Sequence, residues 1–278
     1  MREVTVAAVQ MRPVLNEMEE NLVRMADYII KICGSQKVDI IVFPELITTG
    51  YECGVRFTDL AQRIPGASVN VLAQRAAEFG VYVAFGMPAK EKVESILFNS
   101  AVLIGPDGEL IGDYRKVHLK GEERMTFRAG FRYPIFETKF GNICLLLGYD
   151  LAFPEAARTL ALDGAELILV IANWEKPRNE EWRTFDMARA FENSCFIAAA
   201  NRVGEDVTYS FIGDSMIVGP RGQTLASLAG EIDPKTNEPA EGYALARIDL
   251  YDVRRNREEF QTLQNREPDT YKALVRNY

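Results

Sequence analysis

A single histidine, His118, occurs in the 278 residues of this chain. Zinc sites usually draw on several histidines or cysteines, so this count argues against most of them. It also makes a Ser-His-Asp or Cys-His mechanism depend on one residue. The four cysteines (33, 53, 144 and 195) show no paired spacing, which favours a reduced, cytoplasmic protein. We therefore expect a catalyst here to use carboxylates, lysine or a thiol.

Long apolar runs are also missing, because no segment approaches the ~20 residues of a membrane span. The start, MREVTVAAVQ, alternates as a strand does and lacks the layout of a signal peptide. The net charge of −8 argues against a nucleic-acid or anionic-membrane surface. With no linker, repeat or low-complexity block, we expect one domain over 1–257 and a C-terminal tail, 258–278, packed on the domain or on a partner subunit.

Strand and helix patterns alternate along the chain. Short apolar runs predict buried strands at 4–10, 38–43, 81–86, 142–147, 166–172 and 195–201. Helical patterns lie between them, at 16–33, 68–79, from 153 onward and at 180–193. Turn residues at 105–108 and 220–222 indicate two hairpins. Strand–helix alternation mixed with hairpins predicts a layered α/β fold with mixed sheets.

The stretch 142–155, NICLLLGYDLAFPE, joins a buried strand to the start of a helix. Pro154 suits the first turn of that helix, and Glu155 is favourable near its N-terminus. The turn between the strand and the helix places residue 148 at the carboxyl end of the strand, which is where open α/β sheets place reacting groups. Gly148 has no side chain to present there.

Three ionisable residues, Glu45, Lys116 and Glu123, are candidates for the site. Glu45 comes after an apolar strand and Pro44. It is either an ordinary exposed glutamate or a carboxylate in an apolar pocket, with a raised pKa that suits a general base. Lys116 is either a solvated lysine or a fixed cation for a developing oxyanion. Glu123 lies in a charge run, which by itself is typical of a solvated surface.

These segments together resemble the motifs of the nitrilase superfamily of carbon–nitrogen hydrolases. Gly-Tyr-Asp-Leu-Ala-Phe-Pro-Glu (148–155) matches the family's nucleophile motif, Cys-Tyr-Asp-Leu-x-Phe-Pro-Glu, at every fixed position except the first. Ile-Val-Phe-Pro-Glu-Leu and Tyr-Arg-Lys-Val-His-Leu resemble its other two motifs. The resemblance spans roughly residues 4 to 257. It implies a four-layer α-β-β-α sandwich of two mixed sheets with helices outside.

The resemblance also implies roles for single residues. Glu45 takes the position of the general base, Lys116 that of the catalytic lysine, and Glu123 that of the glutamate that orients lysine and substrate. Gly148 takes the nucleophile position, and His118 a structural one. The substrate pocket is expected to be lined by Tyr51, Tyr149, Asn173 and Trp174. No cofactor or metal is implied, the partner is a small-molecule substrate, and a homodimer or higher homo-oligomer is expected.

The family's cysteine thiolate attacks an amide, carbamoyl or nitrile carbon, and Gly148 supplies no thiol. Cys144 lies four residues upstream, about 13 Å away at ~3.3 Å per residue, and is rejected as a substitute. Cys53 could approach the pocket mouth, but nothing in its spacing makes it a nucleophile. Cys33 and Cys195 read as buried packing residues. We therefore predict an inactive, substrate-binding form.

Tyr-Asp-Leu after position 148 resembles the amidase and carbamoylase branches, so a small aliphatic amide or an N-carbamoyl compound is the expected ligand. The sequence leaves the charge of that ligand's far end open. Three explanations account for Gly148: an enzyme whose cysteine was recently replaced, a natural pseudoenzyme that binds a ligand or partner, and a pure scaffold. The intact trio of Glu45, Lys116 and Glu123 favours the first. If Gly148 merely replaces a cysteine, the existing turn should already suit that side chain, at a cost of about 1–3 kcal/mol.

Overall fold

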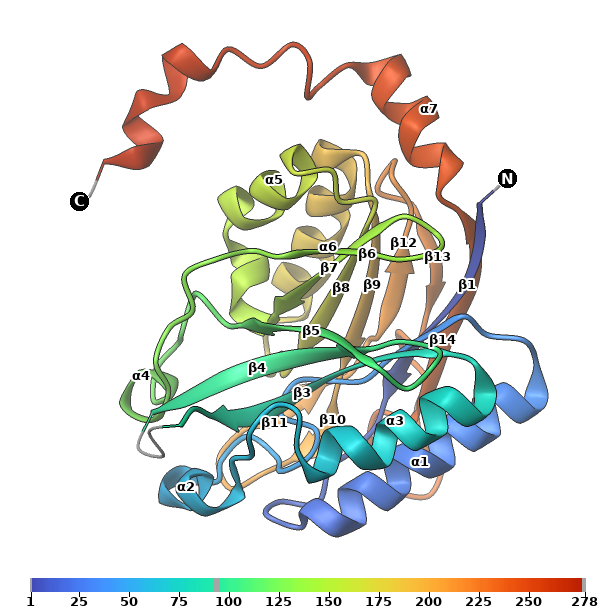
Figure 1. The fold of residues 1–278 in the computed structure, drawn as a ribbon, viewed down its shortest axis with the longest axis vertical. Coiled ribbons are helices and arrows are strands. Elements are labelled where there is room, and N and C mark those ends of the chain that lie inside the picture. The colour runs from blue at the N-terminus through green and yellow to red at the C-terminus, as the bar shows by residue number, and fades with distance from the viewer. Residues whose placement is uncertain (1, 93–95, 277–278) are drawn as a thin grey trace.

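A computed structural model describes residues 2–92 and 96–276 of the chain. Two six-stranded sheets lie face to face, and helices cover their outer surfaces (Figure 1). Each sheet contains parallel and antiparallel neighbours. This arrangement confirms the predicted sandwich of two mixed sheets with helices outside.

The first sheet has the strand order β14-β1-β2-β3-β4-β5. Its strands are β1 (Glu3–Gln10), β2 (Ile40–Val42), β3 (Tyr82–Lys90), β4 (Leu97–Ile104), β5 (Leu110–Arg115) and β14 (Gly242–Asp249). The parallel neighbours β1, β2 and β3 carry the crossover helices α1 (Met18–Ser35) and α3 (Ala67–Phe79). Buried side chains from α1 and α3 pack on the outer face of this sheet.

The second sheet has the order β13-β12-β9-β8-β7-β6. Its strands are β6 (Ile135–Glu137), β7 (Asn142–Leu147), β8 (Leu167–Ala172), β9 (Phe196–Asn201), β12 (Met216–Val218) and β13 (Thr224–Ser227). Helices α5 (Pro154–Leu162) and α6 (Asn179–Asn193) join the parallel strands β7, β8 and β9. A separate ribbon pairs β10 (Val203–Glu205) with β11 (Ser210–Ile212).

The remaining segments are short and connect or end these layers. They are the 3₁₀ turns η1 (Gly54–Arg56), η2 (Gly148–Ala152) and η3 (Pro268–Val275), and the helices α2 (Phe57–Leu60), α4 (Glu123–Thr126) and α7 (Tyr251–Phe260). Beyond α7 the described residues are mostly exposed, and they form an arch over the second sheet's helices (Figure 1). The predicted docking of this tail on the domain or on a partner subunit stays a prediction.

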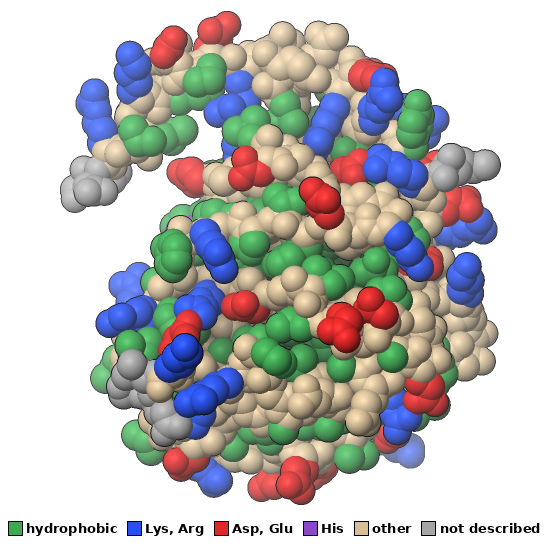
Figure 2. Space-filling view, viewed as in Figure 1, with side chains coloured by type: hydrophobic (Ala, Val, Ile, Leu, Met, Phe, Trp, Pro, Cys, Tyr) green, Lys and Arg blue, Asp and Glu red, His purple; other side chains and the backbone are tan. Residues whose placement is uncertain are grey.

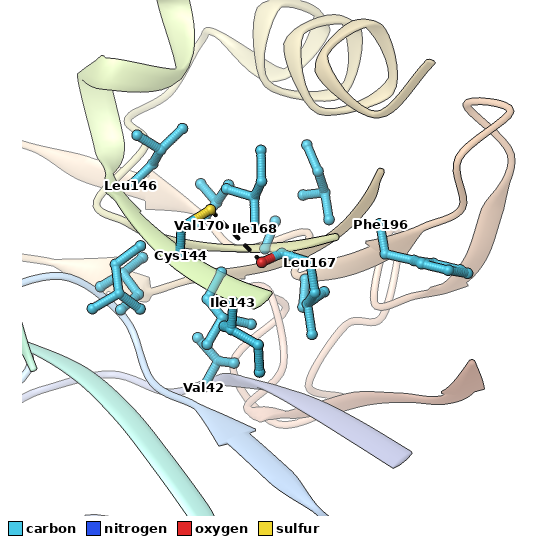
Figure 3. Packing of buried hydrophobic residues seen from close by; sticks show 14 of the residues in the cluster. Val42, Ile143, Cys144, Leu146, Leu167, Ile168, Val170 and Phe196 are labelled. Carbon is cyan, nitrogen blue, oxygen red and sulfur yellow. Dashed lines mark hydrogen bonds between the residues drawn. The ribbon is translucent and has the colours of Figure 1, made fainter. Parts of the chain in front are cut away.

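The main core lies between the two sheets and continues under α5 and α6. Strands β7 and β8 are almost wholly apolar and buried, as expected for parallel strands covered on both faces. Figure 3 shows this packing around Cys144, Leu146, Ile168 and Val170. Because these strands are rigid, they give the residues at their carboxyl ends fixed positions.

Two features of the surface bear on function. The face shown in Figure 2 carries Lys/Arg and Asp/Glu side chains interspersed with one another. Within residues 2–92 and 96–276, no helix is both long and apolar enough to cross a membrane.

Candidate active site

Three ionisable side chains meet at one buried point between the sheets. Glu45 follows β2, Lys116 follows β5, and Glu123 begins α4. The Lys116 Nζ donates to Glu45 Oε1 at 2.7 Å and to both Glu123 oxygens, at 2.7 and 2.9 Å. All three residues are at most 4% exposed. The geometry selects Glu123 over its neighbour Glu122, which is exposed.

Asn99 is a fourth member of this cluster, and the sequence analysis missed it. It lies on β4, and its Nδ2 donates to Glu45 Oε1 at 2.7 Å and to Glu123 Oε1 at 3.1 Å. The side chain therefore links the two carboxylates, and the Asn99 backbone carbonyl accepts a 2.9 Å hydrogen bond from the Lys116 backbone N–H. A signal was available, since Asn99 and Ser100 are the polar residues of an otherwise apolar, buried strand.

Burial and neighbouring charges set the protonation of this cluster. Burial raises the pKa of Glu45 to about 7; Lys116 and the Asn99 hydrogen bond oppose that rise, and Glu123 adds to it. For Lys116, burial lowers the pKa, but the two carboxylates outweigh it and the net direction is upward. The lysine thus stays a cation, while Glu45 can gain or lose a proton near neutral pH.

Gly148 lies directly against this cluster, at the start of η2. An ideal Cβ built on it would lie closer than 3.0 Å to Glu45 Oε2 and 3.5 Å from Lys116 Nζ. The φ of Gly148 is +36°, in the region that side chains rarely adopt. The expectation that a cysteine would fit the existing turn is therefore wrong. Its physical reason is that Glu45 already occupies the space, with Oε2 accepting a 3.0 Å hydrogen bond from the Asn173 backbone N–H.

Asp150 ties the Gly148 turn to the segment that carries Lys116. Its carboxylate is fully buried and accepts hydrogen bonds from Tyr114 Oη at 2.6 Å and from the His118 backbone N–H at 2.8 Å. The His118 Nδ1 lies 2.8 Å from the same carboxylate. The His118 ring also stacks on Phe153, with centroids 3.6 Å apart. These contacts agree with a structural role for His118.

The four residues expected to line the pocket lie in different settings. Tyr51 borders a cavity of about 210 Å³ together with Glu123. Asn173 is 8% exposed, and neither polar atom of its side chain has a partner among the described residues. The Trp174 indole instead donates to the Arg178 carbonyl at 2.9 Å. Tyr149 packs edge-on against Phe153. A substrate-lining role for all four stays a prediction.

None of the four cysteines lies in this cluster. Cys144 is fully buried on β7, and its Sγ points to the Leu167 carbonyl at 3.7 Å (Figure 3). Burial raises the pKa of Cys144 well above its usual range, and that of Cys195 to about 12. Burial also raises the pKa of Cys53 to about 11, and its Sγ contacts the Thr49 carbonyl at 3.3 Å. These thiols therefore pack as small apolar groups.

Known proteins are similar to this chain in sequence and in fold over nearly its whole length. The sequence model of the carbon-nitrogen hydrolase family matches residues 5–258. A probable nitrilase of Schizosaccharomyces pombe is 41% identical over 277 residues, covering 98% of this chain and 99% of that protein. A 2-oxoglutaramate amidase of Bacillus subtilis is 31% identical over 269 residues, covering 96% and 99%. A crystal structure of a carbon-nitrogen hydrolase from Helicobacter pylori G27 superposes with a TM-score of 0.88 at 25% identity, covering 99% of both chains. The chain therefore belongs to the carbon–nitrogen hydrolase family, the nitrilase superfamily.

Proposed function

We propose that this chain carries an amidase-type site that binds a small aliphatic amide or an N-carbamoyl compound and does not turn it over. One observation carries the proposal: the buried Glu45–Lys116–Glu123 cluster lies directly against Gly148, a residue without a nucleophile. Burying two carboxylates and an ammonium carries a large desolvation cost. Such buried clusters with perturbed pKa values are concentrated at functional sites.

The roles follow from the chemistry of C–N hydrolysis. A thiolate at position 148 would attack the carbonyl carbon, and the C–N bond would break as Glu45 returns the proton to the leaving amine. Water would then hydrolyse the thioester. Lys116 is suited to stabilise the oxyanion, and Glu123 holds that ammonium through two hydrogen bonds. Without the thiol, the bound amide has no attacking atom.

Cys144 offers no replacement for the missing thiol in this proposal. It is part of the core between β7 and its neighbours, and burial opposes formation of its thiolate. A nucleophile needs both access and thiolate character. Cys144 has neither.

A natural pseudoenzyme that binds a small ligand or a partner is the second candidate. The observation that favours it is the fit between Glu45 and the glycine, because the carboxylate occupies the space of a missing side chain. A recently altered enzyme would keep that space open for its cysteine. Restoring the cysteine distinguishes the two candidates, as argued in the Discussion.

Calorimetry with acetamide, propionamide, pentanamide and N-carbamoyl amines tests the proposal, alongside an ammonia-release assay. We expect saturable binding of at least one compound and no ammonia above background. Glu123→Gln should weaken that binding at least tenfold, because it loosens Lys116. Glu109→Gln, a matched change on the exposed turn between β4 and β5, should leave it unchanged. No binding to any compound would favour a pure scaffold, and ammonia release with Gly148 in place would refute the thiol requirement.

A further inference from the structure

A cavity of about 210 Å³ reaches the buried cluster at Glu123. It is smaller than the roughly 300–1,000 Å³ typical of sites for drug-sized ligands, so it suits a short molecule. Three segments enclose it: the loop after β2 with η1 and α2, the α4 segment, and the loop between β10 and β11. The lining residues are Tyr51, Glu52, Gly54, Phe57, Glu122, Glu123, Thr126, Phe127, Val207 and Tyr209.

The charged residues that line this cavity are all glutamates. Glu52, Glu122 and Glu123 contribute carboxylates, and no Lys, Arg or His occurs among the described residues that line the cavity. The ammonium of Lys116 is paired with both Glu45 and Glu123. Lys120, which lies between Lys116 and Glu123 in the sequence, is paired with Glu175. A negatively charged ligand would therefore meet repulsion along the cavity.

Aromatic rings form the walls between these carboxylates. Phe57 and Phe127 lie with ring centroids 4.9 Å apart, and Tyr51 and Tyr209 meet edge-to-face at 5.6 Å. An alkylammonium binds favourably against aromatic faces, and more so where carboxylates lie nearby. A carboxylate ligand gains nothing from such rings, whose faces are electron-rich.

The carboxylate of Glu52 is held in place by the opposite loop. It accepts hydrogen bonds from the backbone N–H groups of Thr208 at 2.7 Å and Tyr209 at 3.0 Å, and from the Thr208 hydroxyl at 2.5 Å. Burial tends to raise the pKa of Glu52, but these hydrogen bonds outweigh it and lower the pKa. The carboxylate is therefore ionised at neutral pH and fixed at the cavity.

We infer that the ligand of this site is an amide or carbamoyl compound whose far end is an alkylammonium group. This inference places the amide end at Lys116 and at Asn173, whose side-chain amide has no hydrogen-bond partner among the described residues. It places the ammonium in the cavity, which Glu52, Glu122 and the aromatic rings line. This inference rests on the proposed function, since it assigns the amide end to the Glu45–Lys116–Glu123 cluster.

Calorimetry with three amides of matched length tests it: 4-aminobutanamide, pentanamide and succinamate, which end in an ammonium, a methyl and a carboxylate. At low salt, 4-aminobutanamide should bind about tenfold tighter than pentanamide, and the difference should shrink as salt rises. Succinamate should bind more weakly than either. The double variant Glu52→Gln, Glu122→Gln should reduce the ammonium preference to within about threefold.

Controls separate this inference from the function on which it rests. Glu109→Gln, which removes one negative charge from the β4–β5 turn, should keep the full preference. Pentanamide should bind the double variant with unchanged affinity, which shows that the pocket remains folded. Equal binding of pentanamide and 4-aminobutanamide, or tighter binding of succinamate, would overturn this inference while leaving the amide site intact. If none of the three binds but acetamide, propionamide or an N-carbamoyl amine does, this inference alone fails. If no compound of either panel binds, the proposed function fails and this inference fails with it.

Discussion

The carboxylate of Glu45 fills the space into which a side chain at Gly148 would project. Glu45 Oε2 is held there by the Asn173 backbone N–H, and Oε1 by Lys116 and Asn99. Any side chain at 148 must displace this carboxylate and so disturb those hydrogen bonds. Residue 148 and the general-base position are therefore coupled, and the predictions for each depend on the other.

Gly148→Cys should create amide hydrolysis, which the proposed function excludes for the unaltered chain. Loss of a nucleophile from an assembled site reduces turnover by up to about 10⁶-fold, so the gain can be of that order if Glu45 moves aside. The positive φ and the displaced carboxylate should lower the free energy of unfolding by about 1–3 kcal/mol. Ammonia release from small amides and chemical denaturation measure the two effects.

Gly148→Ala is the matched control for that variant. It adds the same Cβ at the same backbone angle, so its loss of stability should be similar, but it should release no ammonia. A Gly148→Cys, Glu45→Gln double variant should lose the gained activity, because the base is gone. A folded Gly148→Cys protein that binds amides and hydrolyses none would instead identify the chain as a pseudoenzyme.

Glu45→Gln should alter how stability depends on pH. Burial raises the pKa of Glu45 from its ordinary 4.5 to about 7, so the folded state holds this proton more tightly than the unfolded state does. Its contribution is fully present below pH 4.5 and is lost as pH rises to about 7. The stability of the unaltered chain relative to Glu45→Gln should therefore fall by up to about 3 kcal/mol across that window.

Urea denaturation of both proteins at half-unit intervals from pH 4.5 to 8 measures this difference. Glu109→Gln serves as the control, because Glu109 is exposed. A flat difference between the unaltered chain and Glu45→Gln would show that the carboxyl is not protonated in the folded cluster.

Asp150→Ala should destabilise the chain more than Tyr114→Phe. The first change leaves the Tyr114 hydroxyl and the His118 N–H without their acceptor, at about 2–5 kcal/mol. The second removes the hydroxyl's bonds to Asp150 and from the Val117 N–H, but Asp150 keeps the backbone N–H donors of His118 and Leu147, so the loss should be about 1–2 kcal/mol. Thermal unfolding of both variants measures the order. Equal or reversed losses would mean that Asp150 does not anchor the Gly148 turn.

Thiol labelling should rank the cysteines by burial. Cys33 is only partly buried and should react with iodoacetamide first, whereas Cys144 and Cys195 should react only on unfolding. Cys53 should also be slow, since it is 5% exposed. Mass spectrometry of native protein at pH 8 gives the order. Rapid labelling of Cys144 would reopen it as a candidate nucleophile.

The sequence alone determined most of the architecture and the chemical identity of the site. Apolar strands such as β7 and β8 were predicted because burial on both faces produces a continuous apolar run. The motifs around Glu45, Lys116 and Gly148 could be recognised because each one is a short, continuous stretch of sequence that resembles a family motif. The three-residue strands β6, β10 and β11 escaped, since such short segments show no measurable period.

Only the tertiary structure decided how these residues share space. Asn99 joins the cluster because β4 runs beside the segment that carries Lys116, a neighbourhood that no local pattern encodes. The acidic, aromatic cavity arises where three loops distant in sequence converge. Whether a cysteine fits at position 148 likewise depends on Glu45, which reaches that position from the opposite sheet. Packing against distant segments depends on the whole fold. The local sequence therefore identified the ionisable residues of the site, and the fold determined what each of them contacts.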